Sequence, residues 1–247
     1  MIENKKILVN ILARSGSTSI KHKNIADLGG KPVLWYSVTE ALKSKYADAV
    51  CVSTDSKKYA KIAKDAGASV PFLRPAKHSH KKATAAAASR WTTLEYEKFS
   101  GEKYDYIIDF MNSNPFKIVD DLDNCIEMLH KKKNADTVVA VNRLWDGHPD
   151  RIKRIVRGQL QDWPGTKEKL ESMRQDLKPP AYIRSGSVYA MKRHVLIGEV
   201  NRRGKVSIPY ILPDERVCNL DEMKDLYTAR AMITINKAKK KLSKKKK

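Results

Sequence analysis

Short runs of aliphatic residues alternate with longer segments of helical periodicity over the first 142 residues of the chain. The aliphatic runs, such as KILVNIL at 6–12 and TVVAVN at 137–142, are typical of buried strands. The longer segments carry helix starts and stops, with Pro32 in a first turn, Asp55 or Ser56 as a cap, and Gly67 as a stop. The pattern predicts strands at 6–12, 49–54, 68–72, 104–110 and 137–142, and helices at 32–45, 57–66, 83–99 and 119–132.

This repetition of strand and helix predicts a Rossmann-like α/β fold, in which a mostly parallel sheet lies between two layers of helices. In such three-layer folds, ligands bind in the crevice at the carboxyl ends of the strands. We therefore expect the binding residues to lie in the turns that follow the strands.

The alternation breaks after Asn142. Residues 143–180 are polar, contain Trp145, Trp163 and several prolines, and have no clean period. A connection of this length inside a compact domain is more often functional or interfacial than idle, so we expect a dimerisation or lid element. Strands are expected again at 187–191 and 217–220, and a closing helix at 221–233. The domain is thus predicted to span 1–235, followed by a disordered, lysine-rich tail at 236–247.

Composition places the chain among folded soluble proteins. Of its 247 residues, 41% are hydrophobic and 31% charged, which suits one large domain. No apolar run approaches the ~20 residues that a membrane span needs, and the apolar stretch at 7–13 is too short for a signal peptide. We expect a cytoplasmic protein with no membrane partner. Cys51, Cys125 and Cys218 lie far apart, which indicates reduced thiols.

The net charge of +21 is unevenly distributed. Residues 237–247 contribute eight lysines and no acidic residue. Such a run is usually a solvated, frayed terminus, and an arm for nucleic acid or another anionic surface is the alternative. The other basic residues are spread among acidic ones, without the interleaved aromatic side chains that stack on bases. A nucleic-acid partner is therefore disfavoured, and a polyanionic small molecule fits equally well.

The turn after the first strand, ARSGSTSIKHKN at 13–24, is the strongest local signal. Gly16 permits a tight turn whose backbone N–H groups can contact phosphate oxygens, and Arg14 and Lys23 supply positive charge. The segment is neither a Walker A motif nor the GxGxxG of dinucleotide-binding folds. Taken alone, it fits a plain surface turn as well as a phosphate site.

The turn is the first of several sequence blocks. Within it lie Arg14, Gly16, Ser17, Ile20, Lys23 and Asn24, and after it come Leu28, Gly30, Lys31 and Pro32, VSTDS at 52–56, GASVPFLRP at 67–75, RQDL at 174–177, and Gly186 with Tyr189. Together, over about residues 6–232, they resemble the acylneuraminate cytidylyltransferase family of sugar nucleotidyltransferases. The resemblance implies a homodimeric, Mg²⁺-dependent enzyme that converts CTP and a 2-keto sugar acid into a CMP-sugar and pyrophosphate.

The resemblance also implies roles for individual residues. The catalytic residues would be Arg14, Lys23 and Asp221, and the nucleotide phosphates would be bound by Gly16, Ser17 and Asn24. The sugar would be bound by Arg174, Gln175, Ser185 and Tyr189, and the metal ion by Asp221 with Asn219. In the family, a partner subunit completes the sugar site with the segment that holds Arg174 and Gln175. Read without the family, Asp221 fits a helix N-cap, the Arg174–Gln175 pair a solvated loop, and Tyr189 a half-buried strand position. Asp109, at a strand end, is a second carboxylate candidate.

Several positions depart from the family pattern. Thr18 and Ser19 replace a lysine and a glycine, Met111 replaces a glutamine near the sugar, Ser185 replaces an asparagine, and Asn219 replaces an aspartate. These changes are typical of an altered sugar or base preference, and equally of a homologue that binds nucleotide and sugar with weakened or lost turnover. The histidines of His78-Ser79-His80 precede two lysines, so we expect a solvated loop there and no metal ligands.

Overall fold

The computed structural model describes residues 2–166 and 173–245 and contains a central six-stranded sheet in the order β10-β6-β9-β5-β1-β4. Its strands are β1 (Ile7–Leu12), β4 (Ala49–Ser53), β5 (Tyr106–Phe110), β6 (Thr137–Leu144), β9 (Ala181–Lys192) and β10 (Ser207–Ile211). β1 pairs in parallel with β4 and β5, and β10 pairs in parallel with β6. Only β9 runs antiparallel, between β5 and β6. The prediction of a mostly parallel sheet is confirmed.

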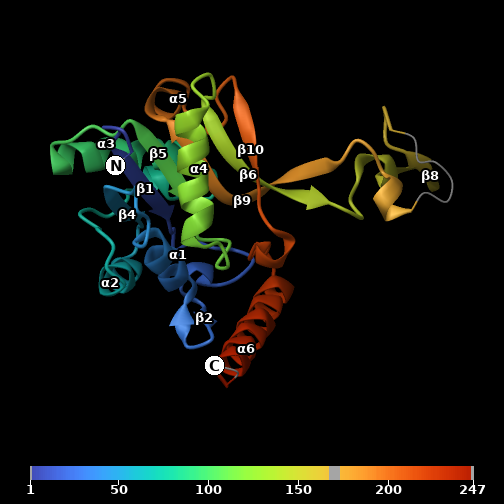
Figure 1. Ribbon diagram of the computed structural model, residues 1–247, viewed down its shortest axis with the longest axis horizontal. Helices are drawn as coiled ribbons and strands as arrows, with labels where there is room; N and C mark the ends of the chain where they lie inside the picture. Colours follow the sequence, from blue (N-terminus) through green and yellow to red (C-terminus); the bar gives the residue numbers. More distant parts are fainter. Residues whose placement is uncertain (1, 167–172, 246–247) are drawn as a thin grey trace.

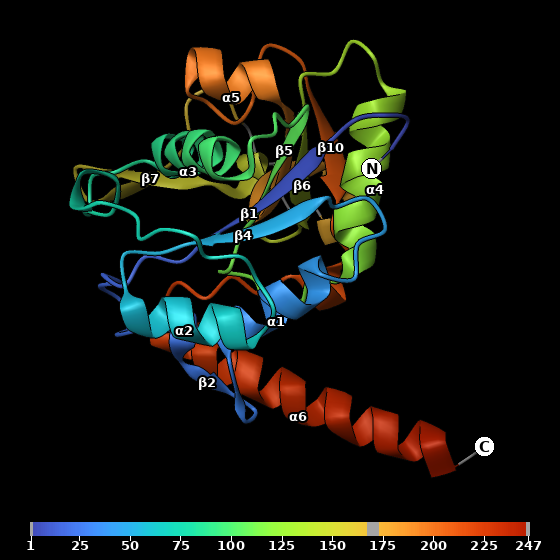
Figure 2. The same ribbon diagram turned by 90° about the vertical axis from the view of Figure 1, so that its left-hand side faces the viewer.

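Helices cover both faces of this sheet (Figure 2). α1 (Val33–Ala41), α2 (Lys57–Asp65) and α4 (Val119–Lys131) lie on one face, and α3 (Ala85–Ser100) and α5 (Arg193–Glu199) lie on the other. Local chemistry sets the ends of these helices. The side chain of Ser56 caps α2, that of Thr84 caps α3, and Gly101, with a φ of 73°, ends α3. The three-layer α/β/α prediction is confirmed.

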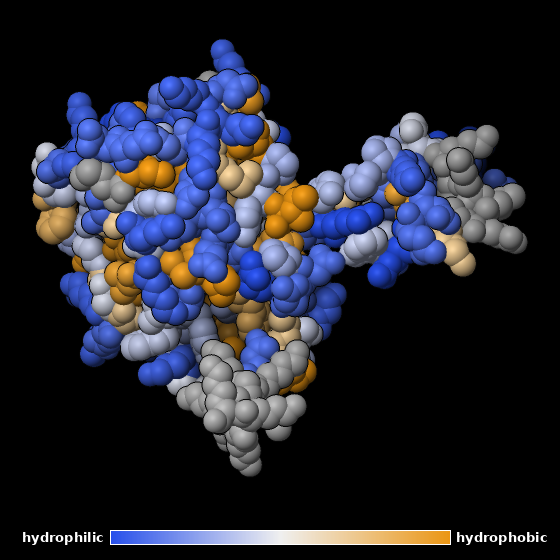
Figure 3. All heavy atoms as spheres, viewed as in Figure 1, coloured by the Kyte–Doolittle hydropathy of each residue, from blue (hydrophilic) through white to orange (hydrophobic). Residues whose placement is uncertain are grey.

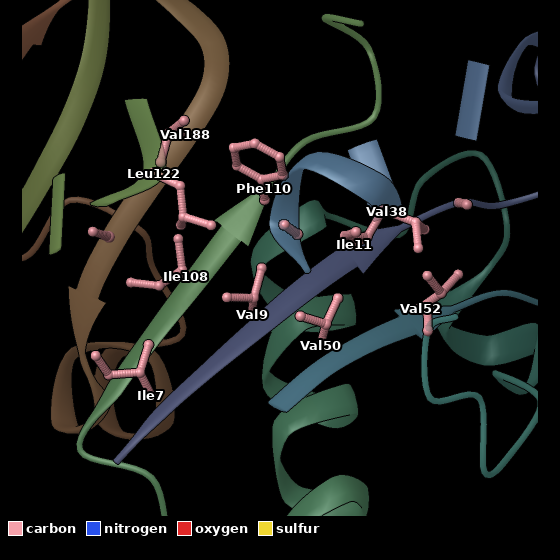
Figure 4. Close-up of a cluster of buried hydrophobic side chains, with 14 of the residues drawn as sticks. Ile7, Val9, Ile11, Val38, Val50, Val52, Ile108, Phe110, Leu122 and Val188 are labelled. Atoms are coloured by element: carbon pink, nitrogen blue, oxygen red, sulfur yellow. The ribbon is translucent and has the colours of Figure 1, made fainter. Parts of the chain in front are cut away.

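Alternating side chains of β1 divide the core between the two faces of the sheet. Ile7, Val9 and Ile11 pack toward α1 and α4 together with Phe110, as Figure 4 shows. Leu8 packs on the opposite face, among side chains of α3, β5 and β9. Because every residue of 7–11 is fully buried, β1 is fixed in register, and its carboxyl end is a rigid platform for the loop that follows.

Two predicted strands do not form. Residues 68–72 make a single bridge, between Ser69 and Cys51, because Pro71 lacks the N–H that would extend a ladder. Residues 217–220 form no strand; Cys218 and Leu220 are buried against α6 instead. The pattern also missed α5 and β10, because the aliphatic residues between 193 and 211 are interrupted by charged residues, glycine and Pro209 and follow no clean helix or strand period.

The excursion at 143–180 is an arm that projects from the body (Figure 1). β6 and β9 continue beyond the sheet as a two-stranded ribbon, with Asn142 opposite Ile183 and Leu144 opposite Ala181. Its outer part holds a hairpin of β7 (Lys153–Val156) and β8 (Gln159–Asp162). Arg157 and Gly158 connect these strands with φ values of 50° and 77°, the left-handed pair of a tight hairpin turn. The excursion thus contains regular strands that its sequence pattern did not indicate, and its role as a dimerisation or lid element stays a prediction.

A second small hairpin, of β2 (Asp27–Leu28) and β3 (Lys31–Pro32), packs against α6 (Met223–Lys245). Leu28 and Val33 form a cluster with Leu226 and Ala229 of α6. The helix was predicted to end near Ile233, but it continues to Lys245, where Lys, Ala and Leu are good helix formers. The disorder expected for the lysine-rich tail at 236–247 stays a prediction. Within the described ranges, no helix combines the length and apolarity that crossing a membrane requires.

Candidate active site

Asp55 fixes the loop that follows β1. Its carboxylate accepts hydrogen bonds from both the backbone N–H and the hydroxyl of Ser15, each at 2.7 Å, and Ala13 N–H donates to the Ser53 carbonyl at 2.9 Å. Asp55 thus ties β1's loop to the end of β4, while Ser56 serves as the helix cap. Gly16 has no positive φ, and a Cβ there would meet no heavy atom within 4 Å. The turn therefore does not need a glycine for steric reasons.

The buried side chain of Asn24 connects the loop after β1 to the segment after β5. Its Nδ2 donates to the Arg14 carbonyl at 2.8 Å, and its Oδ1 accepts from Asn112 Nδ2 at 2.9 Å. Its amide is therefore engaged within the protein and positions Arg14. The Arg14 guanidinium donates through Nη1 to the His80 carbonyl at 3.1 Å, which connects the β1 loop to the segment before α3.

A pocket of about 260 Å³ lies at the carboxyl ends of β1 and β5. Three segments line it: the β1 loop, residues 74–88, and residues 111–113 after β5. Four of the lining side chains are basic, namely Arg14, Lys23, Arg74 and Lys81, and none of the described lining residues is acidic. The N-terminus of α3, with Thr84 and Ala85, also faces the pocket and adds the positive end of its helix dipole. This arrangement can hold several phosphate groups.

Arg74 and the loop after it were missed as site residues by the sequence analysis. Arg74 is only 4% exposed, and its Nε donates to Ser79 Oγ at 3.1 Å. Burial lowers the pKa of Arg74 to about 10, while nearby Asp55 opposes this shift. His78 stacks on Trp91, with ring centroids 5.6 Å apart, and burial with neighbouring cations lowers its pKa. The loop is exposed at 80–82, as expected, and it also lines the pocket through His78 and Lys81. Its signal in the sequence was Arg74 within the GASVPFLRP block.

Asn219 and Asp221 lie in the segment just before α6, and neither lines the pocket. Asp221 contacts Lys23, which does line it. Asp221 Oδ1 lies 3.3 Å from Lys23 Nζ, and its side chain is 68% exposed. Asp225 receives the N–H groups of Asp221 and Glu222, at 2.8 and 2.7 Å. Asp225 therefore fills the capping role that was the alternative for Asp221, whose carboxylate is turned toward Lys23.

Asn219 has an amide oxygen that is buried and without a hydrogen-bond partner among the described residues. Beside it, Gly186 has a φ of 64°, and a Cβ on Gly186 would lie 3.5 Å from Asn219 Nδ2. The Gly186 carbonyl accepts from Ser113 Oγ at 3.3 Å, and the Ser113 carbonyl accepts from Leu220 N–H at 2.9 Å. These contacts join the segments at 113, 186 and 219–221 next to the pocket.

Ser185 and Tyr189 lie on β9, and neither lines the pocket. Ser185 is fully buried, and its hydroxyl donates to the Ala140 carbonyl at 3.0 Å. The structure thus does not support a direct sugar contact by Ser185. Tyr189 is 4% exposed, and the Arg202 guanidinium lies over its ring at 4.1 Å. Asp109 is also fully buried, and its carboxylate is bonded to Ser89 and Arg202.

Arg174 and Gln175 lie on the arm, away from the pocket of their own chain (Figure 1). Arg174 lies 3.6 Å from Asp146, with its guanidinium 5.0 Å from the centre of the Trp145 ring. Gln175 Nε2 contacts Met173 Sδ at 3.1 Å. The structure therefore does not bring these two residues together with Arg14, Lys23 and Asp221 in one protomer.

The fold and the basic pocket at the strand ends define a nucleotide-binding α/β protein. More particularly, the chain belongs to the cytidylyltransferase family, whose model matches residues 8–239.

Individual relatives agree with this assignment. The chain is 27% identical over 231 residues to the pseudaminic acid cytidylyltransferase of Campylobacter jejuni strain 81-176, covering 94% of this chain and 97% of the relative. It is 26% identical to the N-acylneuraminate cytidylyltransferase of Escherichia coli, over 95% of this chain and 53% of the relative. The solved CTP complex of CMP:2-keto-3-deoxy-manno-octonic acid synthetase has a TM-score of 0.65 at 16% identity, covering 94% and 99% of the two chains, and shows the same fold. The family resemblance inferred from the sequence blocks is confirmed.

Proposed function

We propose that this cytidylyltransferase activates a sialic acid-like 2-keto sugar acid with CTP, giving the CMP-sugar and pyrophosphate. The observation that supports this proposal most strongly is the pocket at the carboxyl ends of β1 and β5. Four basic side chains line it, and no acidic residue of the described chain does. A triphosphate is the ligand that best matches this charge. The names of the relatives, which give pseudaminic acid and N-acylneuraminate, support an acidic sugar of this kind as the second substrate. The expected cytoplasmic location stays a prediction.

The reaction is a displacement at phosphorus. A sugar hydroxyl attacks the α-phosphorus of CTP, the new O–P bond forms as the bond to the β-phosphate oxygen breaks, and pyrophosphate leaves with that electron pair. The hydroxyl proton passes to solvent. Arg14, Lys23, Arg74 and Lys81 neutralise the triphosphate and the charge that builds up on the leaving group, and Asn24 and Asp55 hold the loop in place.

The residues present fit a magnesium ion. The buried Asn219 Oδ1 has no partner in the described chain, and the Asp221 carboxylate is exposed, so both can offer hard oxygen ligands. Because the described residues contain no cluster of three acidic, histidine or cysteine ligands, phosphate oxygens and water would complete the coordination. When bound, the ion supplies charge neutralisation at the phosphates.

A homodimer is part of the proposal. The hairpin of the arm exposes large apolar side chains, with Ile155 at 77% and Leu160 at 72% exposure. Exposed apolar surface of this kind is typical of an interface with another protein chain. Apolar atoms also gather where the arm leaves the body (Figure 3), near exposed Ile183 and Ile211. A second copy that covers these surfaces would receive Arg174 and Gln175 at its own pocket.

The direct test measures pyrophosphate release from CTP with Mg²⁺ and a panel of pseudaminic, legionaminic, N-acetylneuraminic and octulosonic acids. We expect turnover with at least one acid and with CTP preferred over GTP, UTP and ATP. Arg14→Gln should reduce kcat/KM by roughly a hundredfold, because a charge-assisted contact to phosphate is lost. Silence of the wild type across all acids and nucleotides would contradict the proposal.

A second candidate, binding without turnover, is favoured by the specific replacement of a metal carboxylate by Asn219. Calorimetry with CTP and Mg²⁺ separates the two possibilities. Binding of CTP together with complete absence of pyrophosphate release would support the second candidate.

A further inference from the structure

Arg202 reaches the edge of the pocket from the loop between α5 and β10. Its Nη1 lies 3.4 Å from the sulfur of Met111, which lines the pocket, and 3.4 Å from Asp109 Oδ2. Its guanidinium carbon lies 4.1 Å from the centre of the Tyr189 ring. Met111 and Tyr189 are both positions that the family resemblance assigns to the sugar. Arg202 therefore contacts the two expected sugar residues from a loop that the sequence analysis did not single out.

The loop that carries Arg202 is held firmly. Asn201 Oδ1 accepts the N–H groups of Arg203 and Gly204, at 2.8 and 2.7 Å. Asp136 Oδ2 accepts those of the next two residues, at 2.7 and 3.0 Å. Gly204 has a φ of 64°, and any Cβ there would clash with Asp136 at 2.4 Å. The backbone of Arg202 is thus preorganised, which lowers the entropy cost of using its side chain to bind a ligand.

Asp109 balances the charge of Arg202. Asp109 is fully buried on β5, and its other oxygen accepts from Ser89 of α3. A buried pair of this kind is neutral overall, so it attracts a second carboxylate weakly. The Nε and Nη2 groups of Arg202 nevertheless make no hydrogen bond with any residue that the structure describes, and the side chain is 18% exposed. Two N–H donor groups are therefore left for an uncharged acceptor.

We propose that Arg202 is a specificity-determining residue that donates hydrogen bonds to an uncharged oxygen of the sugar acid, either a hydroxyl or an N-acyl carbonyl. This inference rests on the proposed function. A thioether cannot donate a hydrogen bond, so Met111 cannot do what an amide at that position would do. Arg202 lies beside Met111, and its Nε and Nη2 groups donate to the sugar oxygen in place of such an amide. Met111 then contributes an apolar side chain to the pocket lining.

The test uses steady-state kinetics of the full chain with its best acid from the panel, and the key variant is Arg202→Met. We expect KM for the sugar acid to rise about tenfold and KM for CTP to stay within about twofold, because one or two hydrogen bonds to the sugar are lost. Adding Met111→Gln to this variant should recover part of the loss. Arg203→Met removes the neighbouring exposed arginine and is the matched control, with both KM values unchanged.

Arg202→Met leaves the buried Asp109 unpaired and can destabilise the fold, so the double variant Asp109→Asn/Arg202→Met is measured as well. Its asparagine keeps an acceptor for Ser89, and its thermal unfolding midpoint reports the integrity of the fold. If the wild type turns over and the folded double variant keeps its KM for the acid within about twofold, the Arg202 proposal is overturned and the proposed function stands. If the wild type shows no turnover with any acid, the proposed function itself fails, and the Arg202 proposal fails with it.

Discussion

In the proposed magnesium site, Asn219 is the residue that we expect to set the affinity for the ion. Its amide oxygen is buried without a partner in the described chain, and Asp221 is the only carboxylate among the residues assigned to the metal ion. A neutral amide is a weaker magnesium ligand than a carboxylate, because it offers no charge to the ion. In the magnesium site that we propose, phosphate oxygens would therefore supply most of the coordination.

Asn219→Asp should therefore increase magnesium affinity. We expect the Mg²⁺ concentration for half-maximal pyrophosphate release to fall roughly fivefold, with KM for the sugar unchanged, because a second charged ligand is added. A magnesium titration of activity at saturating CTP checks this. Asp225→Asn, which alters a helix-capping acid nearby, is the control for added or lost charge. A variant with an unchanged magnesium requirement would exclude residue 219 from the metal site.

Lys117 is a residue whose burial makes stability depend on pH. Its ammonium donates to Ser37 Oγ at 2.8 Å and to the Asn114 carbonyl at 2.7 Å, and lies 4.2 Å from the centre of the Phe110 ring. Burial lowers the pKa of Lys117 from its ordinary 10.5 to about 7. Between these values the unfolded chain holds a proton that the folded protein has released. The free energy of unfolding therefore rises with pH across this window.

Lys117→Met should flatten this dependence. We expect the slope of unfolding free energy against pH, measured by urea denaturation between about pH 7.5 and 10, to decrease by up to ~1.4 kcal/mol per pH unit. The exposed Lys58→Met is the matched control and should keep the slope of the wild type. Identical slopes in the wild type and Lys117→Met would contradict this account. They would show that Lys117 in the folded protein keeps its proton until the pH approaches the ordinary pKa of a lysine.

At the scale of elements, Gly186 sets the local course of β9 beside the site. With a φ of 64°, alanine at this position adopts a left-handed conformation that costs roughly 1–2 kcal/mol. We expect Gly186→Ala to lower the free energy of unfolding by about this amount, measured by urea denaturation. Gly16→Ala is the control, because Gly16 has no positive φ and open space around its Cα, so its stability should be unchanged or slightly higher. Equal effects of the two substitutions would contradict this account.

The elements recovered from the sequence were those with strong local patterns. The strand at 6–12 and the helix cap at Ser56 depend only on residues a few positions away in the sequence, so they were predicted correctly. Other features depend on distant partners. β10 forms because Ser207 to Ile211 pair with β6, and the first half of α6 is positioned by its packing on the hairpin around Leu28. The same holds for the site: the β1 loop was visible in the sequence, whereas Arg74 and Arg202 join it only through the folding of remote segments.

At the scale of the whole molecule, the arm separates Arg174 and Gln175 from the pocket of the same chain. If a second copy supplies them, two inactive variants should complement each other. We expect Arg14→Gln and Arg174→Ala, each weakly active alone, to regain about a quarter of wild-type activity after mixing and subunit exchange, because mixed dimers contain one intact site.

Size-exclusion chromatography with light scattering establishes the dimer in the same samples. A mixture of Arg14→Gln with Lys58→Met should show half of wild-type activity before and after exchange, so it is the control for activity changes caused by mixing itself. Failure of the two inactive variants to complement, with mixed dimers demonstrated, would show that the arm does not complete the site of its partner.

The concentration of cations around the pocket has a practical consequence for handling the protein. Arg14, Lys23, Arg74 and Lys81 repel one another while the pocket is empty, so small multivalent anions such as sulfate should occupy it in a phosphate- or sulfate-containing buffer. Such buffers would raise the melting temperature and at the same time compete with the nucleotide. Preparations in chloride buffer should thus have a lower melting temperature and a higher rate of pyrophosphate release than preparations in sulfate or phosphate buffer.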